Sequence, residues 1–127
     1  MSKLKIAIIL ATLLMPTVMA EYGEIVIFKD NYNKFETVQG EIKFYNISLT
    51  RDITLSNLKF KNAADEDIPI AKNLIKVNDS FYVFYFDIPD IPGGEYRTLL
   101  SDLQVNLEGV ANNLTRDIII NNKSAVS

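Results

Sequence analysis

A two-residue alternation of side-chain character is the feature that most constrains the fold of this chain. Residues 38–45 place apolar or small side chains on one parity, at Val38, Gly40, Ile42 and Phe44. This period is typical of a β-strand with one buried face. No segment carries an apolar stripe at the 3.6-residue period of a helix, so the pattern predicts an all-β fold.

Other β-branched and aromatic runs, separated by turn residues, bring the expected total to seven or eight strands. They cover residues 24–29, 50–61, 68–77, 81–88, 96–100, 103–107 and 115–121, and the run at 68–77 is weak and interrupted around 69–73. Residues 30–33 are rich in Asn and Asp and predict a turn. The apolar parity within residues 50–61 changes near Ser56 and Asn57, which predicts a bulge or a strand break. Residues 81–88 are apolar on both faces and predict a central strand.

The segment from Asp87 to Tyr96 predicts a corner between two strands. It contains two prolines, which oppose regular pairing, and the pair Gly93-Gly94, which permits tight turning. A Gly-x-Tyr sequence at the start of a late strand is typical of the tyrosine corner, in which a phenol bonds to upstream backbone. We therefore expect Tyr96 to have this structural role.

Two segments carry a resemblance to a known family. Residues 32–42 (YNKFETVQGEI) and 84–96 (FYFDIPDIPGGEY) resemble the early and late segments of macroglobulin-type and related immunoglobulin-like modules of prokaryotic secreted or cell-surface proteins. The resemblance implies an immunoglobulin-like antiparallel β-sandwich of seven to eight strands. Such motifs specify a fold and carry no chemistry.

The first twenty residues predict a signal peptide, helical in its apolar part. Lys3 and Lys5 form a basic start, residues 6–15 are apolar, and a small residue ends the segment at Ala20. We expect cleavage between Ala20 and Glu21. An uncleaved membrane anchor is the alternative, but the apolar stretch is shorter than the roughly 20 residues that span a bilayer.

The chain therefore divides into a signal peptide (1–20), one immunoglobulin-like domain (21–121) and a polar C-terminal tail (122–127). This organisation predicts export, to the cell envelope or out of the cell, and no membrane span in the mature chain.

Composition excludes several functional classes. Cysteine, histidine and tryptophan are absent, so disulfides, Cys/His metal sites and Ser-His or Cys-His catalysis lack their donors. Without the first twenty residues, the chain has 11 basic and 16 acidic side chains, a net charge of −5. That sign opposes binding to nucleic acids or anionic membranes.

Four Asn-x-Ser/Thr sequons suggest glycan attachment. Chance predicts roughly one in a chain of this composition. The acceptors are Asn46, Asn78, Asn113 and Asn122, each at an expected strand end or turn. A composition rich in asparagine and the preference of turns for asparagine give the alternative explanation.

Candidate chemistry is sparse. Asp65, Glu66 and Asp67 could converge with Asp30 or Asp90 on Ca²⁺, which prefers oxygen ligands, but no spaced calcium-loop motif is present. A carboxylate pair for glycoside hydrolysis would need a deep cleft, for which a domain of this size has little room. We expect no catalytic residue, no metal site and no cofactor.

The leading hypothesis is a non-catalytic β-sandwich module of a secreted or envelope protein, acting by protein–protein contact or as a spacer. Its partners would be other envelope or surface proteins, met through edge strands. The alternative is a carbohydrate- or calcium-binding module. An exposed Tyr82 or Tyr85 would favour sugar stacking. A chagasin-type protease inhibitor is disfavoured because its Asn-Pro-Thr-Thr-Gly wedge is absent.

Overall fold

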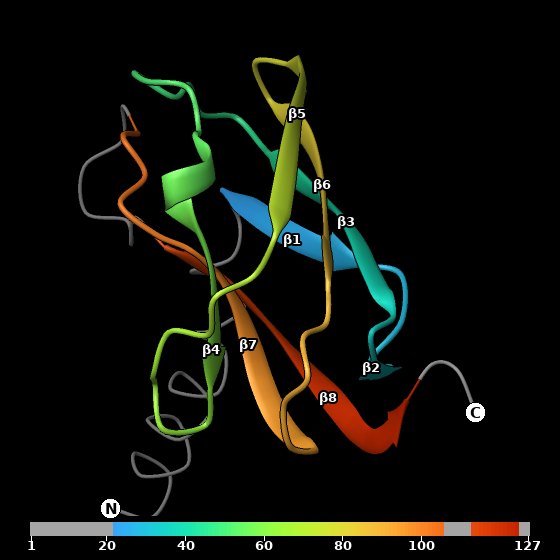
Figure 1. Ribbon diagram of the computed structural model, residues 1–127. Helices are drawn as coiled ribbons and strands as arrows, with labels where there is room; N and C mark the ends of the chain where they lie inside the picture. The colour runs from blue at the N-terminus through green and yellow to red at the C-terminus, as the bar shows by residue number, and fades with distance from the viewer. Residues whose placement is uncertain (1–21, 106–112, 125–127) are drawn as a thin grey trace, which may run out of the picture.

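The computed structural model describes residues 22–105 and 113–124, and these form two four-stranded sheets. Sheet A contains, in spatial order, β1 (Gly23–Ile27), β3 (Thr37–Phe44), β6 (Phe81–Asp87) and β5 (Lys72–Asn78). Sheet B contains β2 (Asn31–Lys34), β8 (Leu114–Ser124), β7 (Gly94–Leu100) and β4 (Leu58–Asn62). All neighbours are antiparallel except β2 and β8, which are parallel (Figure 1). The all-β prediction is confirmed for the described residues, whose only helical segment is the 3₁₀ turn Leu55–Asn57.

The alternation in residues 38–45 positions β3 as expected. Val38, Ile42 and Phe44 are buried, while the other parity faces outward. Gly40 is buried on the same side, and a Cβ there would lie 2.4 Å from the ring of Phe84. The small residue therefore permits the close approach of β6.

The central position expected for residues 81–88 is also correct, since β6 lies between β3 and β5. Its inner row, Tyr82, Phe84 and Phe86, is fully buried. Burial of each such aromatic side chain contributes roughly 1.5–3 kcal/mol relative to exposure.

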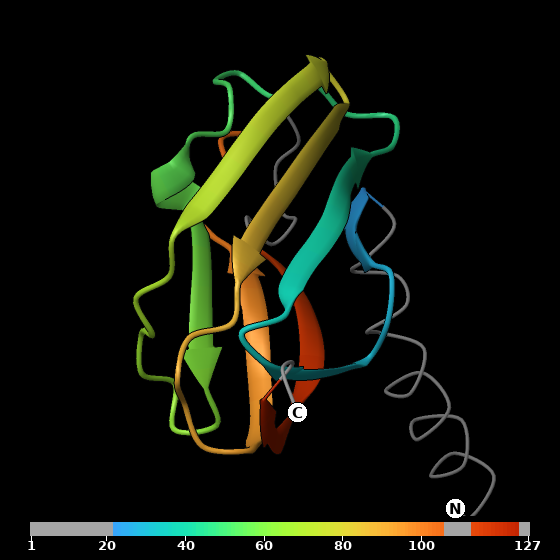
Figure 2. The same ribbon diagram turned by 45° about the vertical axis from the view of Figure 1, so that its right-hand side comes forward.

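Aromatic rings join the two sheets, which pack as two layers (Figure 2). The Phe60 ring of β4 lies 5.1 Å from Phe86 of sheet A and 5.3 Å from Tyr96 of β7, measured between centroids. The core thus continues across both layers, as a chain without cysteine requires.

The turn expected at residues 30–33 is not found there, because Asn31–Lys34 forms strand β2. Tyr32 is buried, and the strand pairs with Ile119 and Ile120 of β8. Pairing with a distant strand therefore overrides the local turn preference of Asn and Asp.

The phase change near Ser56 and Asn57 corresponds to a strand break. The 3₁₀ turn ends at Asn57, and β4 begins at Leu58. Residues 50–54, expected to be the first part of this strand, belong to no strand, although Ile53 is buried in the core. The expected strand 68–77 is paired only from Lys72 onward, where it forms β5.

The expected strand at 103–107 is not a strand in its described part. Val105 makes one isolated bridge to Leu49, and Asp102 has a positive φ of 58° that turns the chain. In contrast, β8 continues through Ser124, so the first three residues of the expected tail 122–127 belong to this strand. The expected signal peptide 1–20 and the cleavage site Ala20/Glu21 lie outside the described residues.

Candidate interaction surface

The corner tyrosine of the sequence analysis lies at the start of β7. The Tyr96 hydroxyl donates a hydrogen bond to the carbonyl of Pro92, four residues upstream, at 2.7 Å. Its ring stacks on Phe60, and burial raises the pKa of the phenol. The residue therefore holds the proline-rich segment against the start of β7, and its role is structural.

The four sequon asparagines are exposed, at different places on the fold: Asn46 after β3, Asn78 at the end of β5, Asn113 before β8 and Asn122 within β8. The Asn78 side-chain oxygen accepts a hydrogen bond from the Ser80 amide at 2.9 Å. That of Asn122 accepts one from the Gly93 amide at 2.7 Å. Glycan attachment at these positions stays a prediction.

The acidic residues considered for calcium all have partners within the fold. Asp65 and Asp67 both approach Lys61, at 3.7 and 3.4 Å. Glu66 accepts a hydrogen bond from the Asn62 side chain at 3.1 Å. Asp90 pairs with Lys34 and Asp30 with Arg116, at 3.3 and 2.5 Å. Within residues 22–105 and 113–124, no three acidic groups converge as metal ligands.

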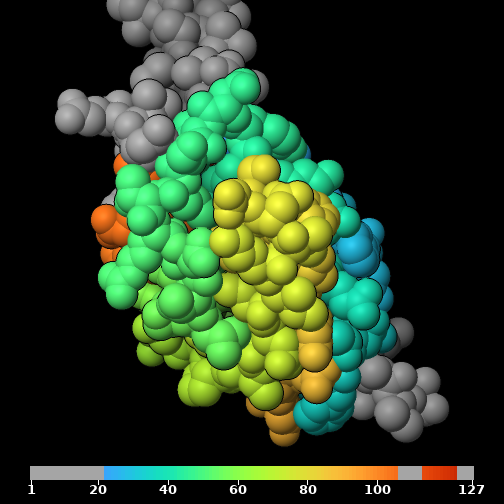
Figure 3. All heavy atoms as spheres, turned by 90° about the horizontal axis from the view of Figure 1, so that it is seen from above, coloured from blue at the N-terminus to red at the C-terminus, as the bar shows by residue number. Residues whose placement is uncertain are grey.

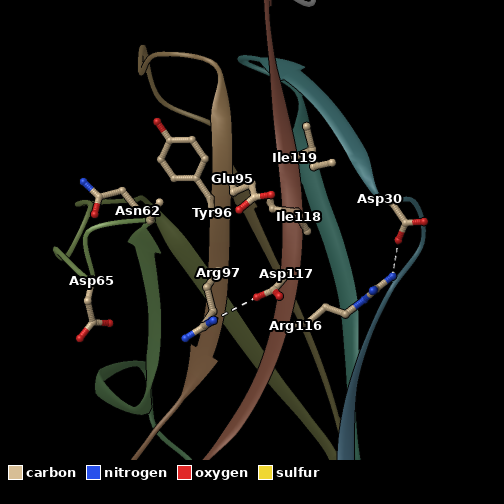
Figure 4. A pocket seen from close by; sticks show the side chains of 11 residues that line it. Asp30, Asn62, Asp65, Glu95, Tyr96, Arg97, Arg116, Asp117, Ile118 and Ile119 are labelled. Carbon is tan, nitrogen blue, oxygen red and sulfur yellow. Dashed lines mark hydrogen bonds and ion pairs between the residues drawn. The ribbon is translucent and has the colours of Figure 1, made fainter.

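A surface groove of about 590 Å³ lies over the outer face of sheet B. Figure 4 shows its two arginine–aspartate pairs: Arg97 with Asp117 at 3.1 Å, and Arg116 with Asp30. Because each arginine already has an aspartate partner, binding of an anionic ligand here would require breaking an ion pair.

The two tyrosines considered for sugar stacking have opposite environments. Tyr82 is only 1% exposed, and its hydroxyl accepts a hydrogen bond from the Ile53 amide at 3.3 Å. Tyr85 is 40% exposed on the outer face of sheet A. Only Tyr85 is therefore available for contact with another molecule.

Tyr85 belongs to an apolar surface that we call the β5–β6 patch. Its members are Ile75, Val77, Phe81, Val83 and Tyr85. Ile75 is 53% and Val77 56% exposed, and Phe81 and Val83 are partly buried. In the strand register Ile75 lies opposite Val83, and Asn73 lies opposite Tyr85. No charged side chain lies among these five residues, although Asp87 ends the same row of β6 and β3 places Glu41 opposite Val83. An outer sheet face is ordinarily polar.

The patch reaches one end of the molecule. The hairpin of β5 and β6 extends beyond sheet B in Figure 1, and its atoms occupy the centre of the view in Figure 3, in yellow. Next to the patch is the free edge of β5, since β5 is the last strand of sheet A.

The equivalent edge of sheet B is partly covered. Beyond β4, the chain bonds back to it through Ile68 N to Phe60 O at 2.7 Å and Asn62 N to Glu66 O at 3.1 Å. No such segment pairs with the edge of β5 in the described part of the chain.

Two lysines lie on the inner row of β5. Lys76 pairs with Asp52 at 3.0 Å and Asp79 at 2.9 Å. The Lys72 ammonium donates to the carbonyl of Leu58. Burial, and secondarily the charge of Lys59, lowers the pKa of Lys72. Lys72 is the one of the two lysines without a carboxylate ion pair to the described residues.

The residues of β5 that form this surface are not among the candidates predicted from the sequence. The signal was present, since 72–77 alternate lysine or leucine with asparagine or β-branched residues. The alternation alone does not reveal which parity faces outward. That is decided by the register, in which Leu74 lies opposite buried Phe84.

Comparison of the chain with models of protein families finds no match, and comparison with curated proteins finds none either. Among the described residues no helix has the length and apolar character needed to cross a membrane.

Proposed function

We propose that this chain is a non-catalytic immunoglobulin-like module that acts through protein–protein contact on the outer face of sheet A. The strand order supports the immunoglobulin-like fold. With strands lettered in chain order and β2 set aside, sheet A has the A-B-E-D order and the other three strands the C-F-G order of such domains. The hydrogen bond from Tyr96, on the strand in the F position, agrees with it.

Export to the envelope or out of the cell is part of the same proposal. It is supported by the signal-peptide pattern of residues 1–20. The macroglobulin-type relationship is supported by the two sequence segments at 32–42 and 84–96. Partners would be other envelope or surface proteins. Of the exposed sequon asparagines, Asn78 adjoins the β5–β6 patch, since it lies opposite Phe81 in the strand register.

The observation that carries the contact function is the β5–β6 patch. An exposed contiguous apolar surface is costly in water and is typical of an interaction site. The groove of about 590 Å³ over sheet B is open and has two ion pairs across it, so it does not offer enclosed catalytic geometry.

Carbohydrate binding is the second candidate, favoured by the exposure of Tyr85. A sugar-binding strip ordinarily offers polar groups beside a stacking ring. Asn73, opposite Tyr85, is such a group, but the remaining neighbours on this face of β5 are Ile75 and Val77. The predominance of aliphatic side chains favours a protein partner.

A photo-crosslinking experiment tests the contact function. Photoreactive p-benzoylphenylalanine replaces Tyr85, or Thr115 on sheet B as the matched control, in the protein produced in its source organism. We expect a discrete protein adduct from position 85 only, and its loss when Ile75→Ser and Val77→Ser are combined with the probe. Absence of an adduct from position 85, or equal adducts from both positions, would contradict the proposal.

A further inference from the structure

The free edge of β5 indicates how a partner is held, an inference that rests on the proposed contact function. We propose that β5 accepts an extended segment of the partner as an additional strand of sheet A, and that this segment alternates apolar with acidic residues. Main-chain hydrogen bonds provide affinity in strand addition, and alternate side chains provide specificity.

The two rows of β5 determine the required alternation. The outer row, Asn73, Ile75 and Val77, is uncharged and continues the β5–β6 patch. Apolar residues of an added strand would extend this patch by cross-strand contact. On the inner row, Lys72 and Lys76 flank Leu74, with no acidic residue in the strand. Lys76 already pairs with Asp52 and Asp79, so Lys72 is the lysine that favours a carboxylate on the matching parity of the added strand.

Lys72 is the principal site for such a carboxylate. A groove of about 320 Å³ beside it is lined by Lys59, Lys72 and a single acid, Asp67. Apolar side chains including Phe60 and Ile68 form the rest of its wall. Lys59 already lies 4.0 Å from Asp102, so a carboxylate entering this groove would pair with Lys72.

A second copy of this chain is a poor occupant of the edge. Antiparallel self-pairing centred on Leu74 places Lys72 opposite Lys76 of the other copy, and pairing centred on Lys76 places two Lys76 residues opposite each other. Like charges directly opposite destabilise a strand pair. Pairing centred on Ile75 avoids both arrangements, but it uses the irregular end of β5, where the register shifts between Lys76 and Asn78.

The edge strand on the other side of sheet A has the opposite charge. β1 carries Glu24 and no lysine. An acidic segment would therefore distinguish β5 from β1, and two lysines at the β5 edge also protect it from indiscriminate pairing.

Peptide binding tests the proposal. The probes are a labelled Val-Glu-Val-Glu-Val-Glu-Val peptide and its Val-Lys counterpart, titrated with the purified protein and followed by fluorescence anisotropy. We expect the acidic peptide to bind about fivefold more tightly, because Lys72, which has no carboxylate ion pair to the described residues, attracts a glutamate and repels a lysine placed opposite it. The combined change Lys72→Glu and Lys76→Glu reverses the preference. Lys29→Glu with Lys43→Glu, an equal charge change elsewhere, keeps it.

An N-methylated acidic peptide separates strand addition from simple charge attraction. Methyl groups on alternate amides remove main-chain donors, so we expect its binding to be lost while its charge is unchanged. This measurement uses the unaltered protein and stands even where the β5 variant does not fold. Equal binding of the acidic and basic peptides, or of the methylated and unmethylated ones, would overturn the proposal.

The two experiments together distinguish failure of strand addition from failure of the proposed contact function. An adduct at position 85, together with equal binding of the acidic and basic peptides, retains the contact function and rejects strand addition at β5. Absence of the adduct rejects the contact function itself.

Discussion

Tyr96 shows how a single side chain links a local motif to the core. Its hydroxyl reaches the carbonyl of Pro92 while its ring stacks on Phe60. The two contacts hold the connection from β6 against the beginning of β7. The spacing between Tyr96 and Pro92 is short, which explains why the sequence alone drew attention to the tyrosine.

Removal of this hydroxyl gives the first prediction. Tyr96→Phe retains the stacked ring but leaves the Pro92 carbonyl without this donor, so we expect the free energy of unfolding to fall by about 1–2 kcal/mol. Urea denaturation followed by circular dichroism measures the change. Tyr85→Phe, which alters an exposed phenol, is the control and should change stability by less than about 0.5 kcal/mol. Equal effects of the two changes would refute a special role for Tyr96.

Removal of the Thr98 hydroxyl is expected to raise stability, whereas removal of the Tyr96 hydroxyl lowers it. It is fully buried on β7, and its hydroxyl has no hydrogen-bond partner among the described residues. Thr98→Val replaces an unpaired polar group with a methyl group, so we expect the unfolding free energy to rise by about 0.5–1 kcal/mol. The same urea titration tests this. Thr37→Val, which removes a 2.6 Å hydrogen bond to Asp87, should lower stability instead. A loss of stability in Thr98→Val would indicate that the hydroxyl is satisfied in solution.

At the scale of elements, the connection between β2 and β3 is held by one carboxylate. Glu36 accepts hydrogen bonds from the Asn33 amide, at 2.7 Å, and from the Lys29 ammonium. The lysine, and then the amide, lowers the pKa of Glu36 below its ordinary value of 4.5. Phe35, which lies between Asn33 and Glu36 in the sequence, has a positive φ of 68°.

The lowered pKa predicts a pH dependence of stability. The ionised form is favoured in the folded state, so its contribution is complete above the unfolded-state pKa and is lost as the pH falls through the folded-state pKa. We expect Glu36→Gln to be about 0.5–1 kcal/mol less stable at pH 7, a small value because Lys29 is half exposed. The difference should disappear as the pH is lowered well below 4. Urea titrations across this range measure it, with Glu95→Gln as a control for removing a carboxylate. A difference that persists at low pH would argue against ionisation as its cause.

Strands β2 and β6 illustrate what sequence can and cannot predict about an element. The central position of β6 was recognisable because apolar residues on both parities are a local property of the strand. The short strand β2 was expected to be a turn, since Asn and Asp favour turns locally. Its pairing with β8 depends on residues almost ninety positions away, and no local pattern encodes that contact.

At the scale of the whole molecule, ion pairs organise most of the acidic loops. Asp30, Asp65, Asp67 and Asp90 all lie within 4.0 Å of a basic side chain. The core supplies the cohesion, as two sheets bury a continuous set of aromatic and aliphatic side chains.

This arrangement predicts folding that does not depend on metal. We expect one cooperative unfolding transition, coincident by tyrosine fluorescence and circular dichroism, with a midpoint unchanged by EDTA or by millimolar Ca²⁺. The physical reason is that the acidic groups already have basic partners, so calcium would have to displace them. Thermal and urea titrations with and without the ion measure this. A clear rise of the midpoint in Ca²⁺ would favour the ligand-binding alternative.

The sequence by itself determined the all-β class, the buried face of β3 and the central place of β6, because side-chain alternation follows from the geometry of a single strand. Only the tertiary structure decided which strands meet, and therefore that Asn31–Lys34 is a strand and that Ile75 and Val77 face outward beside Tyr85. Pairing and exposure depend on contacts between residues far apart in the chain. For the same reason, the lysine-lined free edge of β5, which we propose as an interaction site, became recognisable only once its neighbours were in place.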